Sequence, residues 1–167
     1  MGTRVSALAT CAALLTTGLV AGTLLPASSQ QAPTESFTTC DKNKVRFEKE
    51  INERKKRFGA GDWGVFTQPE FDPQTGDKVG RVVGRFVFVK KTSKRDGHFV
   101  ADVTTNLPQG KLMIYGSSKF SNFEKGVRFA ITGGTGAYAG ARGSVVVREA
   151  KCRGARGTRV TYSIVKG

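Results

Sequence analysis

The chain has 167 residues, a length that leaves room for one domain and an export signal. Its 27 Lys and Arg residues against 13 Asp and Glu give a formal net charge of +14, which favours anionic partners. Three cysteines and one histidine, without a Cys-x-x-Cys pair or a Cys/His cluster, argue against a structural zinc site.

The first 29 residues have the features of an export signal. Arg4 supplies a positive start, residues 7–25 are almost uninterrupted small and apolar residues, and Ala27 and Ser29 form a small-x-small cleavage site. The alternative is a retained membrane anchor, since about 18 apolar residues can span a bilayer. Because Thr and Gly dilute this stretch and no positive cluster follows it, we predict a signal peptide at 1–29, a secreted product and no stable membrane span after cleavage.

Two cysteines remain after this cleavage, Cys40 and Cys152. An even number of cysteines in an oxidising compartment favours a disulfide, and we predict that these two pair. Such a bond would tie the start of the domain to its last hairpin. The alternative is two free thiols.

The remaining chain reads as a short leader followed by one all-β domain. Residues 30–41 are polar, contain Pro33 and show no periodicity, which predicts a flexible leader before a domain at 42–167. Short runs rich in Val, Phe and Thr, separated by glycine-bearing turns, are typical of a sandwich or barrel. We predict strands at 62–71, 78–91, 98–106, 111–120, 127–132, 143–149 and 158–166.

Residues 45–58 are ambiguous. Their Glu, Lys and Arg content favours a helix, whereas Val45 and Phe47 alternate with polar residues as they would in a strand. Counting this segment as a strand gives eight, the number that closes a small antiparallel up-and-down barrel. Closure also removes the exposed sheet edges that an open meander would present.

A glycine-rich stretch at 131–143 is the most distinctive motif, with the sequence Ile-Thr-Gly-Gly-Thr-Gly-Ala-Tyr-Ala-Gly-Ala-Arg-Gly. A nucleotide-binding loop would need a helix directly after it, but the β-branched run Ser-Val-Val-Val at 144–147 follows instead. The motif therefore predicts a tight, bulged connection between two strands.

This motif resembles the Gly-Gly-Thr-Gly-aromatic and Ala-Arg-Gly signature of the dirigent proteins and their relatives, the allene oxide cyclases. Two further stretches are similar to the cyclases: Gly-Asp-Trp-Gly-Val-Phe-Thr at 61–67 and Glu-Ile-Asn-Glu at 50–53. The resemblance covers roughly residues 45–167. It implies an eight-stranded barrel with an apolar interior, often a homotrimer, that guides the cyclisation or coupling of apolar small molecules without a cofactor.

The same resemblance implies a set of site residues. Glu50 and Asn52 match catalytic cavity residues of the cyclases, and Gln68 matches a cavity amide. Phe86 and Ser118 stand where the cyclases carry a cavity Cys and a cavity Tyr, so the cavity is expected to differ in shape. Glu50 and Asn52 share one face of a strand, but whether that face meets the cavity or solvent stays open, because the opposite face carries Val45, Phe47 and Ile51.

These observations lead to a secreted barrel that binds an apolar small molecule and steers its cyclisation or isomerisation. If the protein is an enzyme, it is a cofactor-independent isomerase or cyclase; the sequence leaves enzyme status open. The alternative is a non-catalytic exported basic protein that docks to anionic cell-envelope polymers. Nucleic acid is the least favoured partner because export separates the protein from it.

Overall fold

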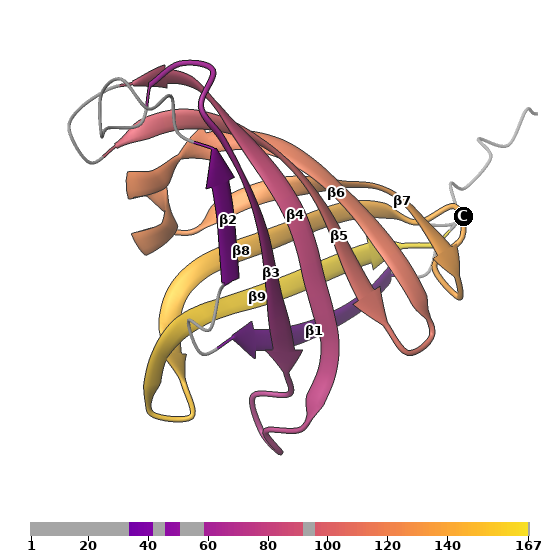
Figure 1. The fold of residues 1–167 in the computed structure, drawn as a ribbon. Coiled ribbons are helices and arrows are strands. Elements are labelled where there is room, and N and C mark those ends of the chain that lie inside the picture. Colours follow the sequence, from indigo (N-terminus) through magenta and orange to yellow (C-terminus); the bar gives the residue numbers. More distant parts are fainter. Residues whose placement is uncertain (1–33, 42–45, 51–58, 92–95, 167) are drawn as a thin grey trace, which may run out of the picture. The chain divides into compact units, whose positions relative to one another are not determined.

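A computed structural model describes residues 34–41, 46–50, 59–91 and 96–166, with the side chains of 46–50 and 91 left out. Figure 1 shows these residues forming one barrel of long, strongly tilted strands. Almost all of the described chain is strand, with one short 3-10 helix, η1. The elements are β1 (Thr34–Asp41), β2 (Arg46–Glu50), β3 (Trp63–Phe71), β4 (Lys78–Lys91), β5 (Gly97–Leu107), β6 (Gly110–Lys119), η1 (Phe120–Glu124), β7 (Val127–Gly136), β8 (Arg142–Cys152) and β9 (Ala155–Val165).

Eight of these strands close an antiparallel barrel, as the sequence predicted. Strands β3 to β9 each pair with the next along the chain, and β1 pairs with β9 over its whole length, from Thr34↔Val165 to Asp41↔Thr158. At its other edge β1 meets the end of β3 through Cys40↔Phe71, which completes the ring. Strand β2 pairs with the first half of β3 beyond that point.

The strand that closes the barrel is β1, and the prediction of a flexible leader at 30–41 is wrong for residues 34–41. Polar residues dominate β1, but tertiary contacts hold it in place: Phe37 stacks on Tyr162 with ring centroids 4.6 Å apart, and Cys40 is disulfide-bonded. Of the ambiguous segment at 45–58, residues 46–50 form β2 and the rest lies outside the described residues.

Alternation along the strands places one face of each in the interior. In β4, Val82, Phe86 and Phe88 are buried, whereas Val83 and Val87 between them are exposed. A glycine makes room for one of these rings: a Cβ atom at Gly64 of β3 would lie 2.7 Å from Cζ of Phe86. The inner faces thus build a core rich in phenylalanine.

The glycine-rich motif is a bulged connection between strands, as predicted. Its first half belongs to β7, where the register with β6 shifts between Met113 and Ile114. The chain turns after Gly136, which has a φ of +62°, and re-enters the sheet as β8. Tyr138, in that turn, is buried against the core.

The predicted disulfide between Cys40 and Cys152 is present, with Cα atoms 5.8 Å apart and a sequence separation of 112 residues. It joins β1 to the end of β8, so that the closing strand is held covalently as well as by its ladder. Within the described ranges, no helix is long and apolar enough to cross a membrane.

Candidate functional site

The barrel encloses a cavity of about 570 Å³. Its walls are mostly apolar, and aromatic rings line one part of it: Phe66, Phe86, Phe99, Phe120, Phe123 and Phe129. Two of these rings come from η1, which Figure 1 shows beside the ends of the barrel strands. Phe120 meets Phe86 edge to face at 5.8 Å, and Phe123 stacks on Phe99 at 5.9 Å. The helix therefore covers this part of the cavity with aromatic surface.

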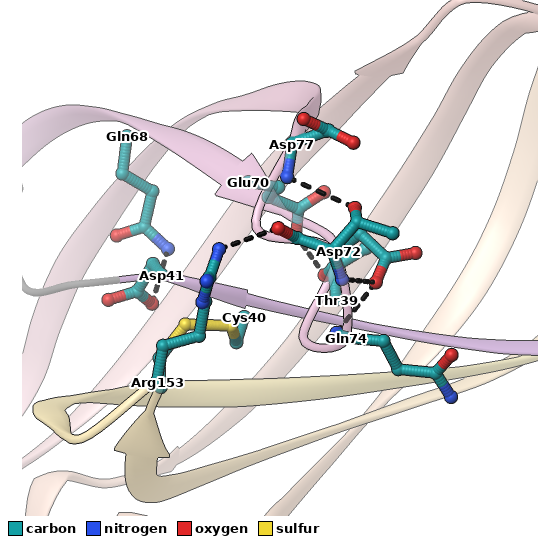
Figure 2. Close-up of a disulfide and its surroundings, with 11 residues drawn as sticks. Thr39, Cys40, Asp41, Gln68, Glu70, Asp72, Gln74, Asp77 and Arg153 are labelled. Atoms are coloured by element: carbon teal, nitrogen blue, oxygen red, sulfur yellow. Dashed lines mark hydrogen bonds between the residues drawn. A yellow bond between two sulfur atoms is a disulfide. The ribbon is translucent and has the colours of Figure 1, made fainter.

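The wall also carries a buried acid, Glu70 of β3, whose side chain is 0% exposed. Its Oε1 atom accepts two hydrogen bonds, from the hydroxyl of Thr39 at 3.0 Å and from the hydroxyl of Tyr162 at 2.7 Å. Figure 2 shows Glu70 and Thr39 facing each other next to the disulfide. The acid is thus held by one donor from β1 and one from β9.

The second oxygen of this carboxyl group, Oε2, is buried and has no hydrogen-bond partner among the described residues. Buried polar atoms in native proteins are nearly always hydrogen-bonded, so an orphan of this kind calls for a functional explanation. Because Glu70 lines the cavity, a bound molecule could supply the missing partner.

Burial raises the pKa of Glu70 from 4.5 to about 7. The hydrogen bonds from Tyr162 and Thr39 lower the pKa and the charge of Asp41 raises it, but desolvation is the largest of these influences. Burial and the nearby Glu70 also hold the pKa of Tyr162 well above its usual value, so this phenol stays protonated and remains a donor. A carboxyl group with a pKa near neutrality can both give and take a proton under physiological conditions.

A short relay of hydroxyl groups stands behind this acid. Tyr162 has one proton, which it donates to Glu70, so the Thr105 hydroxyl 3.0 Å away is the donor to the Tyr162 oxygen. All three side chains are buried and all three line the cavity. This chain of hydrogen bonds runs from Thr105 through Tyr162 to Oε1 of Glu70, and it leaves Oε2 without a partner among the described residues.

Two of the three predicted cavity residues line the cavity. Phe86 belongs to its aromatic part, and Gln68 lies one inward position before Glu70 on β3, where its amide donates to Asp41 at 3.2 Å (Figure 2). Ser118 does not line the cavity: it lies at the end of β6, half-buried, and its hydroxyl accepts a hydrogen bond from Asn122 at 3.2 Å.

The predicted catalytic pair stays a prediction. Glu50 is the last residue of β2, where its backbone pairs with Trp63, and its side chain is not among those described. Asn52 lies outside the described residues. Within the described part of the chain, no group of three or more His, Cys, Asp or Glu side chains is arranged to hold a metal ion.

Sequence reasoning missed Glu70, Thr105 and Tyr162. A signal for Glu70 was present, because residues i and i+2 of a strand share a face and Gln68 was already assigned to the cavity. Pro69 lies between them, and a proline in a strand indicates an edge or a bulge, where the alternation of faces can be interrupted. No local signal marked Tyr162, whose role depends on the pairing of β9 with β1.

Several solved structures are similar to this barrel. Pyocyanin demethylase matches with a TM-score of 0.62 and 22% identity, over 75% of this chain and 98% of that one. The Diels-Alderase AbmU from Streptomyces koyangensis gives a TM-score of 0.61 and 15% identity, over 84% of this chain and 72% of that one. The pterocarpan synthase dirigent protein GePTS1 gives 0.59 and 19%, over 83% and 89%.

Neither a protein-family model nor a curated protein matches the sequence. At these identities the structural neighbours show a shared fold, and the barrel that the dirigent-like resemblance implied is confirmed at that level. The chain thus has the antiparallel barrel fold of the dirigent proteins and the Diels-Alderase cyclases.

Proposed function

We propose that this protein binds an apolar small molecule inside the barrel and steers its cyclisation or isomerisation without a cofactor. The observation that carries this proposal is the apolar cavity of about 570 Å³ with a buried carboxyl group in its wall. Its volume lies in the range of sites for small organic ligands, and such sites typically combine apolar walls with a few placed polar groups.

Confinement in such a site can by itself favour ligand binding and lower a reaction barrier. Burying apolar surface contributes about 25 cal/mol per Å², which favours uptake of a ligand that fits the phenylalanine-lined walls. A flexible molecule held in a folded shape has its reacting atoms close together before reaction, which lowers the entropic part of the barrier. The cavity requires no metal for this role.

The names of the structural neighbours support a catalytic role but do not point to one substrate. They describe a demethylase, a Diels-Alderase and a pterocarpan synthase, three different conversions on one barrel architecture. Because function is carried by sites placed on folds, these names support catalysis in the cavity and leave the substrate to be determined.

Glu50 and Asn52 remain part of the proposal as catalytic residues. Strand β2 pairs with the first half of β3, so that Glu50 lies opposite Trp63, next to the Gly64 over which Phe86 packs. The support for the two residues comes from the resemblance to the cyclases. With the native substrate in hand, Glu50→Gln is expected to lower kcat and to leave the barrel's thermal unfolding unchanged. An unchanged kcat would remove Glu50 from the site.

Assembly and export belong to the same proposal. The outer faces of β4 and β6 expose apolar side chains on either side of the Arg85–Asp102 ion pair, and these side chains support the homotrimer implied by the resemblance: Val83, Val87, Val89, Met113 and Tyr115. Sedimentation velocity would distinguish a trimer from a monomer. N-terminal sequencing of the exported protein is expected to find a chain that starts at about residue 30, after the signal peptide.

Filling the cavity tests the proposed binding. Ala101 is 6% exposed and lines the cavity, so Ala101→Phe adds a ring inside it; Val83 is 46% exposed, so Val83→Phe adds the same ring outside. Titration with the neutral fluorophore N-phenyl-1-naphthylamine is expected to show binding to the wild type and to Val83→Phe. The affinity of Ala101→Phe is expected to be lower than that of the wild type by about tenfold or more. Equal affinities of the two variants, or no binding by the wild type, would contradict the proposal.

A further inference from the structure

Among the described residues, one buried side-chain polar atom has no hydrogen-bond partner, Oε2 of Glu70, and Glu70 lines the cavity. The hydroxyl groups next to it are engaged: Thr39 and Tyr162 donate to its Oε1 atom, and Thr105 is hydrogen-bonded to Tyr162. A ligand beside Glu70 therefore meets an open hydrogen-bonding position at Oε2.

The hydrogen bonds on Oε1 determine where the acid proton lies. Oε1 accepts from both Thr39 and Tyr162, and a carbonyl-type oxygen has two lone pairs to offer. In the neutral acid the proton is therefore on Oε2, and the open position is a donor. An apolar site that keeps a carboxylic acid neutral in this way allows it to donate to a substrate oxygen.

The position of this donor along the barrel sets the orientation of a ligand. Glu70 lies near the end of β3, and Phe66, a phenylalanine of the cavity wall, lies four residues earlier on the same strand. At about 3.3 Å per residue, these two levels are roughly 13 Å apart along the strand. The polar and aromatic parts of the cavity are thus separated by about the length of a three-ring molecule.

We propose that the ligand is an apolar carbonyl compound, such as an aryl ketone, an enone or an unsaturated lactone, whose carbonyl oxygen accepts a hydrogen bond from Oε2 of Glu70 while its hydrocarbon body lies against the phenylalanines. This assignment rests on the proposed function and names its substrate class. As the carbonyl oxygen gains negative charge during cyclisation or isomerisation, the hydrogen bond from Glu70 strengthens. The proton is shared with the oxygen and returns to Glu70, so the carboxyl group is unchanged after each turnover.

Two probes of the same shape isolate this contact. Benzophenone carries a carbonyl oxygen, and 1,1-diphenylethylene has a methylene group in its place. Calorimetric or fluorescence-displacement titration would measure both with the wild type, with Glu70→Met, which removes the donor, and with Glu70→Gln. The glutamine amide can accept from Thr39 and Tyr162 through its oxygen and donate to the ligand through its nitrogen.

Glu70→Met is expected to reduce the affinity for benzophenone by a factor about fivefold or more larger than the factor for 1,1-diphenylethylene. This difference corresponds to the loss of one hydrogen bond. Glu70→Gln is expected to keep most of the benzophenone affinity. The infrared carbonyl band of bound ¹³C-labelled benzophenone should lie below its position in a hydrocarbon solvent in the wild type and in Glu70→Gln.

The outcomes separate this inference from the proposed function. If both probes bind and Glu70→Met affects them equally, the cavity binds apolar molecules and the carbonyl assignment is wrong. Should Glu70→Met fail to fold, a carbonyl band at the hydrocarbon position in the wild type overturns the assignment by itself. If neither probe binds the wild type and N-phenyl-1-naphthylamine also fails, the proposed function falls and the assignment falls with it.

Discussion

At the scale of single residues, Glu70 shows how a strand in a barrel can hold a titratable group away from water. The carboxyl group is stabilised by two hydroxyl donors and penalised by desolvation, and desolvation has the larger effect on its pKa. Among the described residues, the ionisable side chains that act on its pKa are Asp41 on β1, which raises it, and Tyr162 on β9, which stays protonated.

The raised pKa makes stability depend on pH. Below about pH 4.5 Glu70 is protonated in both the folded and unfolded states, and its contribution to stability is fully present. Between pH 4.5 and about 7 the unfolded chain releases the proton and the folded chain keeps it, so the free energy of unfolding falls as pH rises, by about 3 kcal/mol in total.

Urea unfolding of the wild type and of Glu70→Gln between pH 4.5 and 8 would measure this contribution. The difference between the two proteins is expected to change by about 3 kcal/mol across this range and to be flat above it, because other carboxyl groups cancel in the comparison. Parallel curves would show that Glu70 titrates as an ordinary surface acid.

At this scale the sequence named some of the residues that lie in the cavity wall. Gln68 and Phe86 were assigned to the cavity through the dirigent-like resemblance and line it. Glu70 could have been found by extending the alternation from Gln68, but its donors could not. Thr39 and Tyr162 are 31 and 92 residues away in the chain, and only the closure of the barrel brings them to Glu70.

At the scale of secondary structure elements, β1 is the strand on which closure depends. It provides the partner for β9 along eight residues and the donor Thr39 for the site. The sequence identified β4 at residues 78–91 with its observed bounds, because this run is rich in Val and Phe and glycines recur within it. It missed β1, because the inward residues Thr39 and Asp41 meet polar partners rather than a core.

Shortening the chain would test the role of β1. A chain of residues 31–167 is expected to unfold cooperatively on heating, whereas residues 42–167 should lose the cooperative transition and aggregate, because the β9 edge and the Tyr162 face become exposed. Circular dichroism melts and size-exclusion chromatography would follow both. A control chain of residues 31–167 with Cys40→Ser and Cys152→Ser separates the loss of the strand from the loss of the disulfide.

The same control measures the disulfide. Its loop spans 112 residues, and the chain-entropy estimate for a loop of this length is about 4–5 kcal/mol. The double serine variant is therefore expected to fold and to lose up to about 4 kcal/mol of unfolding free energy. If dithiothreitol leaves wild-type unfolding unchanged, the bond contributes no stability.

At the scale of the whole molecule, the excess of positive charge is the feature that the cavity does not explain. The formal net charge is +14, and the three described ion pairs are all solvent-exposed, so they offset little of the field around the barrel. Docking on an anionic envelope polymer therefore remains the alternative function for the outer surface.

Salt dependence distinguishes binding to the charged outer surface of the barrel from binding in its cavity. Affinity for a sulfated polysaccharide such as heparin is expected to fall by about tenfold or more between 50 and 200 mM NaCl, because counterions are released when the polymer binds. Binding of N-phenyl-1-naphthylamine should be insensitive to the same change. If polysaccharide affinity does not respond to salt, the net charge does not drive the interaction.

The pairing of β1 with β9 has a consequence for biosynthesis. Because the chain is made from its N-terminus, β1 is synthesised well before its partner β9, and Cys40 is synthesised 112 residues before Cys152. Glu70 obtains one hydroxyl donor from each of these strands, Thr39 from β1 and Tyr162 from β9. A nascent chain that ends before β9 can contain most of the sheet yet cannot form the hydrogen bonds around the buried acid, so this site assembles only after β9 has been made.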